Sequence, residues 1–294
     1  MKRTVGLMLA GALGSLAMTS AAAAQTVKVE NAIARVVYMP EERSDIVVEV
    51  TGNTANLPAP QVRRERGNVV IDGQLGRRGF RSMNCNGGSR STPPSRPGEG
   101  ASVSTRETGR VALEDAPMIV VRGPRGITIR ADGAVYGAVG RGAESVDLGS
   151  SGCGTWVVAN VPGQVKLAIS GSGDVWTGSA EDMTIQISGS GDVRVANVED
   201  LSVAIAGSGD VSVRRADGDV RVSIAGSGDV TIADGRIDNL SVNLAGSGDV
   251  DIGGVVHDVS ASMAGSGDIV IRRVTGDVSQ RAMGSGKIRI LDRN

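Results

Sequence analysis

The sequence predicts an all-β protein, a parallel β-helix or β-solenoid with rungs of 18–20 residues and two short strands per rung. A glycine-rich motif recurs at a nearly fixed interval, and apolar and polar residues alternate between its copies. The chain is also 40% hydrophobic but only 2% aromatic. A fixed period of this length is typical of stacked supersecondary units. Aromatic rings would wedge thin stacked layers apart, so we expect an interior of aliphatic side chains.

The recurring motif is Gly-Ser-Gly, which occurs seven times at spacings of 18, 18, 19, 20, 19 and 19 residues. A decayed eighth copy, Gly152–Gly154, lies 19 residues before the first. Six copies continue with aspartate, whereas the last continues with Lys287. We expect the six aspartates to occupy equivalent turns and to form a ladder with a structural role: Asp174, Asp192, Asp210, Asp229, Asp249 and Asp268.

Two short strands are predicted in each period. In one unit, Val193 and Val195 alternate with polar neighbours, and after a turn Leu201, Val203 and Ile205 do the same. A period of two residues indicates one buried and one solvated face. Because every unit repeats the pattern, the buried positions stack on one another in parallel sheets.

The last unit differs from the others. It has Gln280 at an inward position and Lys287 in place of the turn aspartate. A polar and charged terminal rung disfavours end-to-end association through an open strand edge, so we interpret this unit as a cap.

Residues 1–24 have the features of a secretory signal peptide. Lys2 and Arg3 precede an apolar run that ends in small residues, and we expect cleavage after Ala24. The run is too short and too rich in Gly and Ala for a membrane span, and no other run approaches that length. We therefore expect an exported mature chain without a transmembrane segment, located in the periplasm, at the cell surface or outside the cell.

Three further segments follow. Residues 25–75 are predicted to be an N-terminal β segment, either two irregular rungs or a small separate β unit. Residues 76–110 contain seven Arg and two Glu and are predicted to be a flexible basic insertion, a solvated loop or one whose arginines meet an anionic envelope surface. Residues 111–294 are predicted to form the β-solenoid repeat domain.

The two cysteines, Cys85 and Cys153, are 68 residues apart. Export would place them in an oxidising compartment, where we expect them to form a disulfide. Two free thiols or a redox role are the alternatives, and the absence of a Cys-x-x-Cys spacing disfavours the redox role.

Composition argues against several classes of function. The net charge of −1 and the scarcity of aromatic residues disfavour nucleic-acid binding. The only histidine, His257, is expected in an exposed turn, so the sequence indicates no metal site, cofactor or catalytic residue. Trp176 is expected to point outward, either as an ordinary exposed residue or as a platform for a sugar or protein.

The aspartate ladder allows two interpretations. Carboxylates about one rung apart repel one another by about 1 kcal/mol per pair in water, which a cation such as Ca²⁺ would offset. The calcium-binding nonapeptide repeat has a shorter period and a spacer before its aspartate, so it does not match. We favour a structural role, in which each carboxylate accepts hydrogen bonds from turn amides or serine hydroxyls.

The units "ISGSGDV" (Ile169–Val175) and "IAGSGDV" (Ile205–Val211 and Ile224–Val230), with the entry stretch "MIVVRGPRGITI" (Met118–Ile129), resemble the GIN domain family. Its members are described as head domains of auto-transporter adhesins. The resemblance covers about residues 109–294, and it implies an exported parallel β-solenoid with a role in adhesion and no catalytic residues.

Together these observations predict a non-enzymatic exported module of the cell envelope, with an adhesion, binding or structural role. Its expected partner is an extended glycan or an envelope protein. A polysaccharide-active β-helix enzyme (a lyase or hydrolase) and a calcium-dependent solenoid are the alternatives. The acidic residues are periodic and equivalent, so none is distinguished as a catalytic acid or base.

Overall fold

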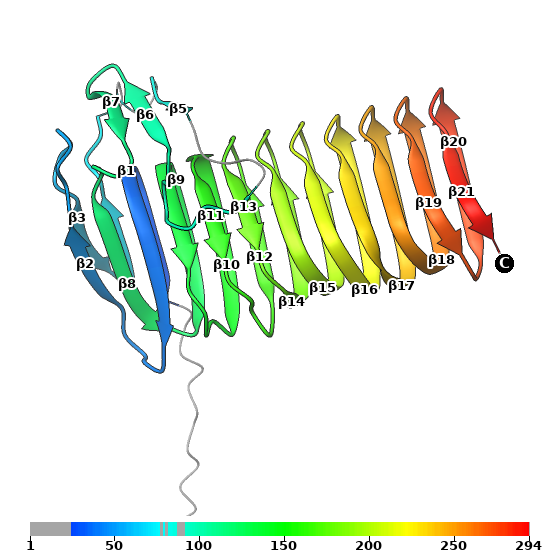
Figure 1. Ribbon diagram of the computed structural model, residues 1–294, viewed down its shortest axis with the longest axis horizontal. Coiled ribbons are helices and arrows are strands. Elements are labelled where there is room, and N and C mark those ends of the chain that lie inside the picture. The colour runs from blue at the N-terminus through cyan, green and yellow to red at the C-terminus, as the bar shows by residue number, and fades with distance from the viewer. Residues whose placement is uncertain (1–24, 77–78, 80–81, 87–91, 294) are drawn as a thin grey trace, which may run out of the picture.

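The computed structural model describes residues 25–76, 79, 82–86 and 92–293. They form a long coil of parallel β-strands that rises along one axis (Figure 1). Equivalent residues of successive rungs are 18 to 20 positions apart, as in the series Val193, Val211, Val230 and Val250. The predicted all-β, β-solenoid fold is therefore confirmed. The predicted signal peptide, residues 1–24, lies outside the described residues.

The strands of the coil pair in parallel along its axis. They are β1 (Thr26–Glu41), β4 (Asn68–Asp72), β8 (Met118–Pro124), β9 (Gly126–Val139), β10 (Ser145–Cys153), β11 (Thr155–Val158), β12 (Val165–Ile169), β13 (Asp174–Thr177), β14 (Ala180–Ile187), β15 (Val193–Ile205), β16 (Val211–Gly226), β17 (Val230–Gly246), β18 (Val250–Gly265), β19 (Ile269–Val274), β20 (Val278–Gly284) and β21 (Ile288–Arg293). In β15 to β18 the two short strands of a rung merge into one bent strand, because the ladder continues around the corner with a local shift of register.

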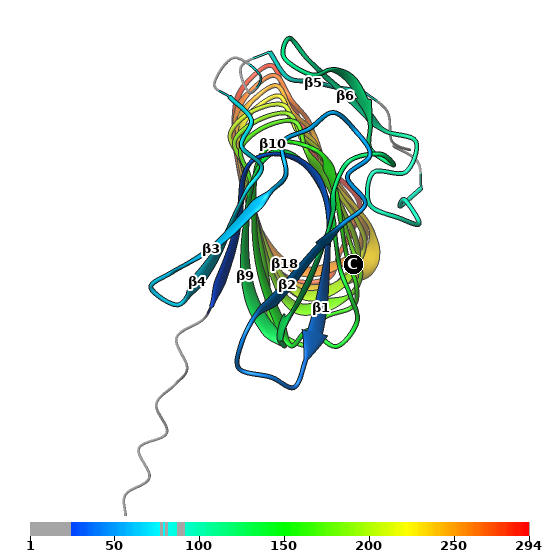
Figure 2. The same ribbon diagram turned by 90° about the vertical axis from the view of Figure 1, so that its left-hand side faces the viewer.

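The N-terminal segment is part of the coil. β1 pairs in parallel with β9, β8 and β4, which favours irregular rungs over a separate β unit. Two further strands run in the opposite direction: β2 (Val47–Thr51) pairs with β8, and β3 (Gln61–Glu65) pairs with β4. They lie at the N-terminal end of the coil, where they occupy the strand edges of its first rung (Figure 2).

A single hydrophobic core runs through the coil, built mainly from stacked Val, Ile and Leu side chains. The expectation that this interior excludes aromatic rings is wrong at Trp156 and Tyr38, which are both fully buried. Trp156 fits because Gly137, its partner in the neighbouring rung, has no side chain. The Trp156 ring occupies the space that a Cβ on Gly137 would fill. The Tyr38 hydroxyl donates a hydrogen bond to the Pro124 carbonyl oxygen at 2.6 Å.

The described part of the predicted flexible insertion contains ordered strands. Within it and the adjoining residues, β5 (Asn84–Asn86), β6 (Ser102–Thr105) and β7 (Gly109–Ala112) form an antiparallel sheet on the outside of the coil (Figure 2). Val103 and Leu113 are buried there against Ile33 and Tyr136, which project outward from the coil. Strands of three or four residues are too short to show an alternation of apolar and polar residues in the sequence. Their burial depends on contacts with residues far away in the chain, so the sequence pattern did not predict them.

The last rung, β20 and β21, pairs only with β18 and β19 among the described strands. Met283 and Leu291 are 61% and 67% exposed at this end of the coil. Lys287 occupies the turn, as the sequence indicates, and its backbone N–H donates to Asp268 Oδ1 at 2.9 Å. No helix in the described part of the chain is long and apolar enough to cross a membrane.

Candidate functional site

The six turn aspartates form a continuous series of hydrogen bonds along the coil. The backbone N–H of each aspartate from Asp192 onward donates to Oδ1 of the aspartate one rung earlier, at distances of 2.7 to 3.1 Å. The expected donors are turn amides, and the amide that donates belongs to the turn of the next rung. The ladder therefore connects successive rungs at the turn.

Two of the second carboxylate oxygens have an arginine partner. Asp192 Oδ2 lies 3.5 Å from Arg194, and Asp268 Oδ2 accepts a hydrogen bond from Arg289 at 2.7 Å. Among the described residues, no group of three or more His, Cys, Asp or Glu side chains is arranged to hold a metal ion. At these two turns the arginines offset part of the repulsion between neighbouring carboxylates.

A second polar ladder runs along the opposite corner, where the second strand of each rung begins. Asp182 pairs in register with Asp200, and the Asp219 backbone N–H donates to Asp200 Oδ1 at 2.8 Å. Asn239 Nδ2 then donates to Asp219 Oδ1 at 2.8 Å, and further along Asp277 N–H donates to Asp258 Oδ1 at 2.7 Å. The signal in the sequence is an Asp, Asn or Gln directly before the second strand of these rungs, which is less conspicuous than Gly-Ser-Gly-Asp.

This second ladder borders a shallow groove of about 370 Å³ that crosses five rungs. We call it the polar groove. The groove is lined by the carboxylates and amides of the ladder: Gln164, Asp182, Asp200, Asp219 and Asn239. It is also lined by outward side chains two positions further along the second strands, mostly hydroxyls, which stack in register: Thr184, Ser202, Arg221 and Ser241. Each rung thus presents nearly the same set of hydrogen-bonding groups to a ligand.

Trp176 and His257 have local partners. The Arg194 guanidinium lies over the Trp176 ring, 4.8 Å from its centre, so one face of the ring is occupied. His257 lies within β18 rather than in a turn, because the strand continues around the corner, and its Nδ1 is 3.3 Å from Thr275 Oγ1. Neither arrangement gives a distinct catalytic site.

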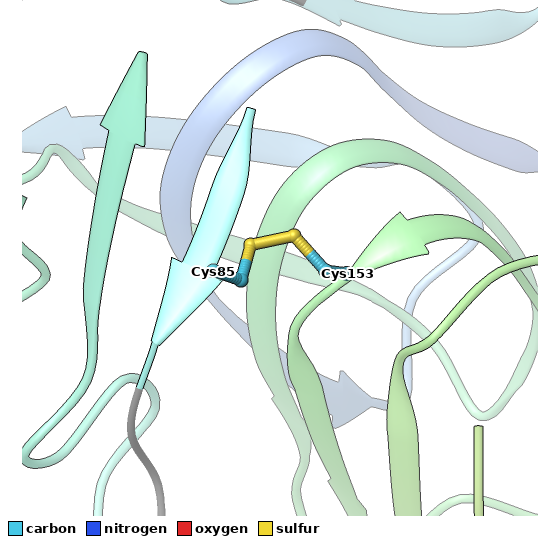
Figure 3. Close-up of a disulfide and its surroundings, with 2 residues drawn as sticks. All are labelled: Cys85 and Cys153. Atoms are coloured by element: carbon cyan, nitrogen blue, oxygen red, sulfur yellow. A yellow bond between two sulfur atoms is a disulfide. The ribbon is translucent and has the colours of Figure 1, made fainter. Parts of the chain in front are cut away.

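The predicted disulfide between Cys85 and Cys153 is confirmed (Figure 3). Cys85 belongs to β5 of the insertion, and Cys153 ends β10 of the coil, with 6.3 Å between their Cα atoms. Both lie against the outer hydrophobic cluster that contains Ile33 and Tyr136. The bond therefore attaches the insertion to the outer face of the coil.

The stacked rungs and the two ladders define the class of the protein as a β-solenoid with glycine-aspartate turns. A family model described as "Putative auto-transporter adhesin, head GIN domain" matches residues 102–234 and 195–293. The chain belongs to this family, as the resemblance in its repeats indicates. No curated protein matches the chain.

Among solved structures, a crystal structure titled as a "Putative lipid binding protein from Parabacteroides distasonis" is similar to this chain, with 17% sequence identity and a TM-score of 0.40. The similarity covers 92% of each chain. For this chain, the disulfide and the adhesin-head family indicate an extracytoplasmic protein.

Proposed function

We propose that this protein is a non-enzymatic binding module of the cell envelope, exported to the periplasm, the cell surface or the medium, that holds an extended glycan in the polar groove. The observation that carries the proposal is the repetition of the same polar groups across five rungs of the groove. A ligand that is itself a chain of similar units can make equivalent contacts with each rung, about 4.8 Å apart. The adhesin-head family is consistent with such a role.

The chemistry of the groove suits sugar hydroxyls. Carboxylates such as Asp182 accept hydrogen bonds, serine and threonine hydroxyls both donate and accept, and the side-chain amides of Gln164 and Asn239 do both as well. A shallow groove also admits a long ligand from the side. A compact ligand would find little enclosure there.

Binding explains this arrangement better than catalysis does. A glycosidase separates an acid from a base by giving two carboxyl groups different surroundings. In the polar groove, Asp200 and Asp219 occupy equivalent positions, and Oδ1 of each already accepts a hydrogen bond within the coil. Such carboxylates are suited to making the same contact with each unit of a repeating ligand. None of them has the distinct surroundings that a catalytic acid or base needs.

A glycan array with the mature chain, residues 25–294, tests the proposal. Ser202→Arg places a long side chain in the polar groove, whereas Ser212→Arg places the same side chain on the outward face of the first strand of the next rung, away from the groove. We expect Ser202→Arg to weaken glycan binding at least tenfold and Ser212→Arg to leave it within twofold, with both variants folded by circular dichroism.

Three results would contradict the proposal. They are the absence of any glycan signal, equal effects of the two variants, and turnover of an acidic polysaccharide that a single Asp or Arg substitution abolishes. The last result would establish the polysaccharide-active alternative.

A further inference from the structure

A second hollow, of about 740 Å³, lies where the insertion packs against β1. We call it the insertion pocket. It is lined by Arg35 of β1, by the loop that precedes β6, and by Arg110 of β7. Its volume is in the range of small-ligand sites, and it shares no residue with the polar groove.

Three arginines surround the insertion pocket, and one of them is fixed in place. Arg35 donates from Nε and Nη2 to the Ala116 carbonyl oxygen at 3.3 and 2.8 Å. Arg96 and Arg110 also line the pocket, and neither guanidinium group has a hydrogen bond or ion pair in the part of the chain that the structure describes. Two guanidinium groups are therefore available to an incoming anion.

The other polar groups of the pocket suit a ligand with hydroxyls. Ser102 lines the pocket, and its hydroxyl has no hydrogen-bond partner among the described residues, so it is open to a ligand. Glu99 accepts the Ser95 backbone N–H at 2.8 Å, and Glu114 also lines the pocket. A serine hydroxyl in this position can both donate a hydrogen bond to a ligand and accept one from it.

The charges decide which anion fits. Three arginines and two glutamates leave an excess of one positive charge, which matches one carboxylate better than a doubly charged phosphate. Arginine binds carboxylates through two parallel hydrogen bonds, while glutamate and serine accept hydrogen bonds from hydroxyls. We propose that the insertion pocket binds the uronic acid unit of an acidic saccharide, with Arg96 and Arg110 on the carboxylate and Ser102 and Glu99 on the hydroxyls.

Calorimetry with the full mature chain tests this assignment. The probe is a disaccharide of glucuronic acid and xylose, and the matched neutral probe has glucose in place of glucuronic acid. We expect the acidic disaccharide to bind at least tenfold more tightly than the neutral one, with an affinity that falls as salt is added. Inorganic phosphate is the third ligand and should bind more weakly than the acidic disaccharide.

Variants identify the site. Arg110→Gln and Arg96→Gln should each weaken binding of the acidic disaccharide at least fivefold, whereas Arg214→Gln, an exposed arginine on the coil, should leave it within twofold. Ser202→Arg in the polar groove should also have no effect, so this proposal and the proposed function can fail separately. Equal binding of both disaccharides, tighter binding of phosphate, unchanged binding in both pocket variants, or loss through Ser202→Arg would each overturn the proposal.

Discussion

Oδ1 of Asp249 accepts the backbone N–H of Asp268, its equivalent in the next rung, at 2.7 Å. The Asp268 carbonyl oxygen in turn accepts the Val250 N–H at 2.9 Å. The residue after each Gly-Ser-Gly is thus bound to the preceding rung through both its amide and its carbonyl. The carboxylate provides the acceptor at the point where the chain turns. Hydrogen bonding between successive rungs therefore continues through the turn.

Removing one such acceptor should destabilise the coil. Asp229→Ala leaves the Asp249 N–H without its acceptor, and we expect a loss of about 1 kcal/mol in the free energy of unfolding. Asp229→Asn keeps an oxygen in the same place and should stay within about 0.5 kcal/mol of the wild type. Urea denaturation measures both variants, and equal losses would show that the charge matters and the hydrogen bond does not.

The glycines of the turns should tolerate no side chain. A Cβ on Gly248 would collide with the carbonyl oxygen of Gly228 one rung earlier, so the backbone of one rung must shift. We expect Gly248→Ala to cost about 2 kcal/mol or more, because neither backbone can move without breaking ladder hydrogen bonds.

Gly126→Ala is the matched control for that substitution. The atom nearest to its Cβ would be Ser145 Oγ at 3.1 Å, the end of a side chain that can rotate away. Thermal unfolding should show a large fall in melting temperature for Gly248→Ala and a small change for Gly126→Ala. Similar melting temperatures would mean that the rungs do not approach as closely as described.

The two tyrosines should ionise only at unusually high pH. Burial raises the pKa of Tyr136 to about 12 and raises the pKa of Tyr38 still further above its ordinary range. These are the two tyrosines of the chain, so the folded protein should show almost no phenolate absorbance near pH 10, where an unfolded tyrosine ionises.

The same shifts predict a loss of stability at high pH. Unfolded tyrosines ionise near pH 10 and the buried ones do not, so the stabilisation is complete below about pH 10 and decreases as the pH rises towards 12. Tyr136→Phe should reduce this decrease in the free energy of unfolding. An ordinary phenolate titration in protein that circular dichroism shows to be folded would contradict the burial of both rings.

Loss of the disulfide should destabilise the protein without abolishing the coil. The bond closes a separation of 68 residues, for which the chain-entropy model gives about 4 kcal/mol. We expect Cys85→Ser with Cys153→Ser to lose up to this amount and to keep its β-sheet circular dichroism, because the coil has its own core. Mass spectrometry after alkylation, with and without reductant, verifies the bond, and alkylation without reductant would contradict it.

Several features of the fold and the site could be predicted because they are local and repeated. The alternation of apolar and polar residues is enough to predict that Val193, Val195 and Leu201 point inward. The copies of Gly-Ser-Gly-Asp indicate where each rung turns. Trp156 could not be placed, because its burial depends on Gly137, which is 19 residues away and belongs to no repeat motif. The polar groove was missed because its ladder accepts Asp, Asn or Gln and so leaves a weak pattern.

By itself the sequence determined the coil, its period and its buried face. These follow from a short pattern whose repetition stacks each residue on its own equivalents. Only the tertiary structure decided that β1 belongs to the coil, that the insertion packs over Tyr136, and that Arg35, Arg96 and Arg110 meet around one pocket. Those contacts join segments far apart in the chain that share no period, so their meeting depends on shape and packing rather than on any local signal.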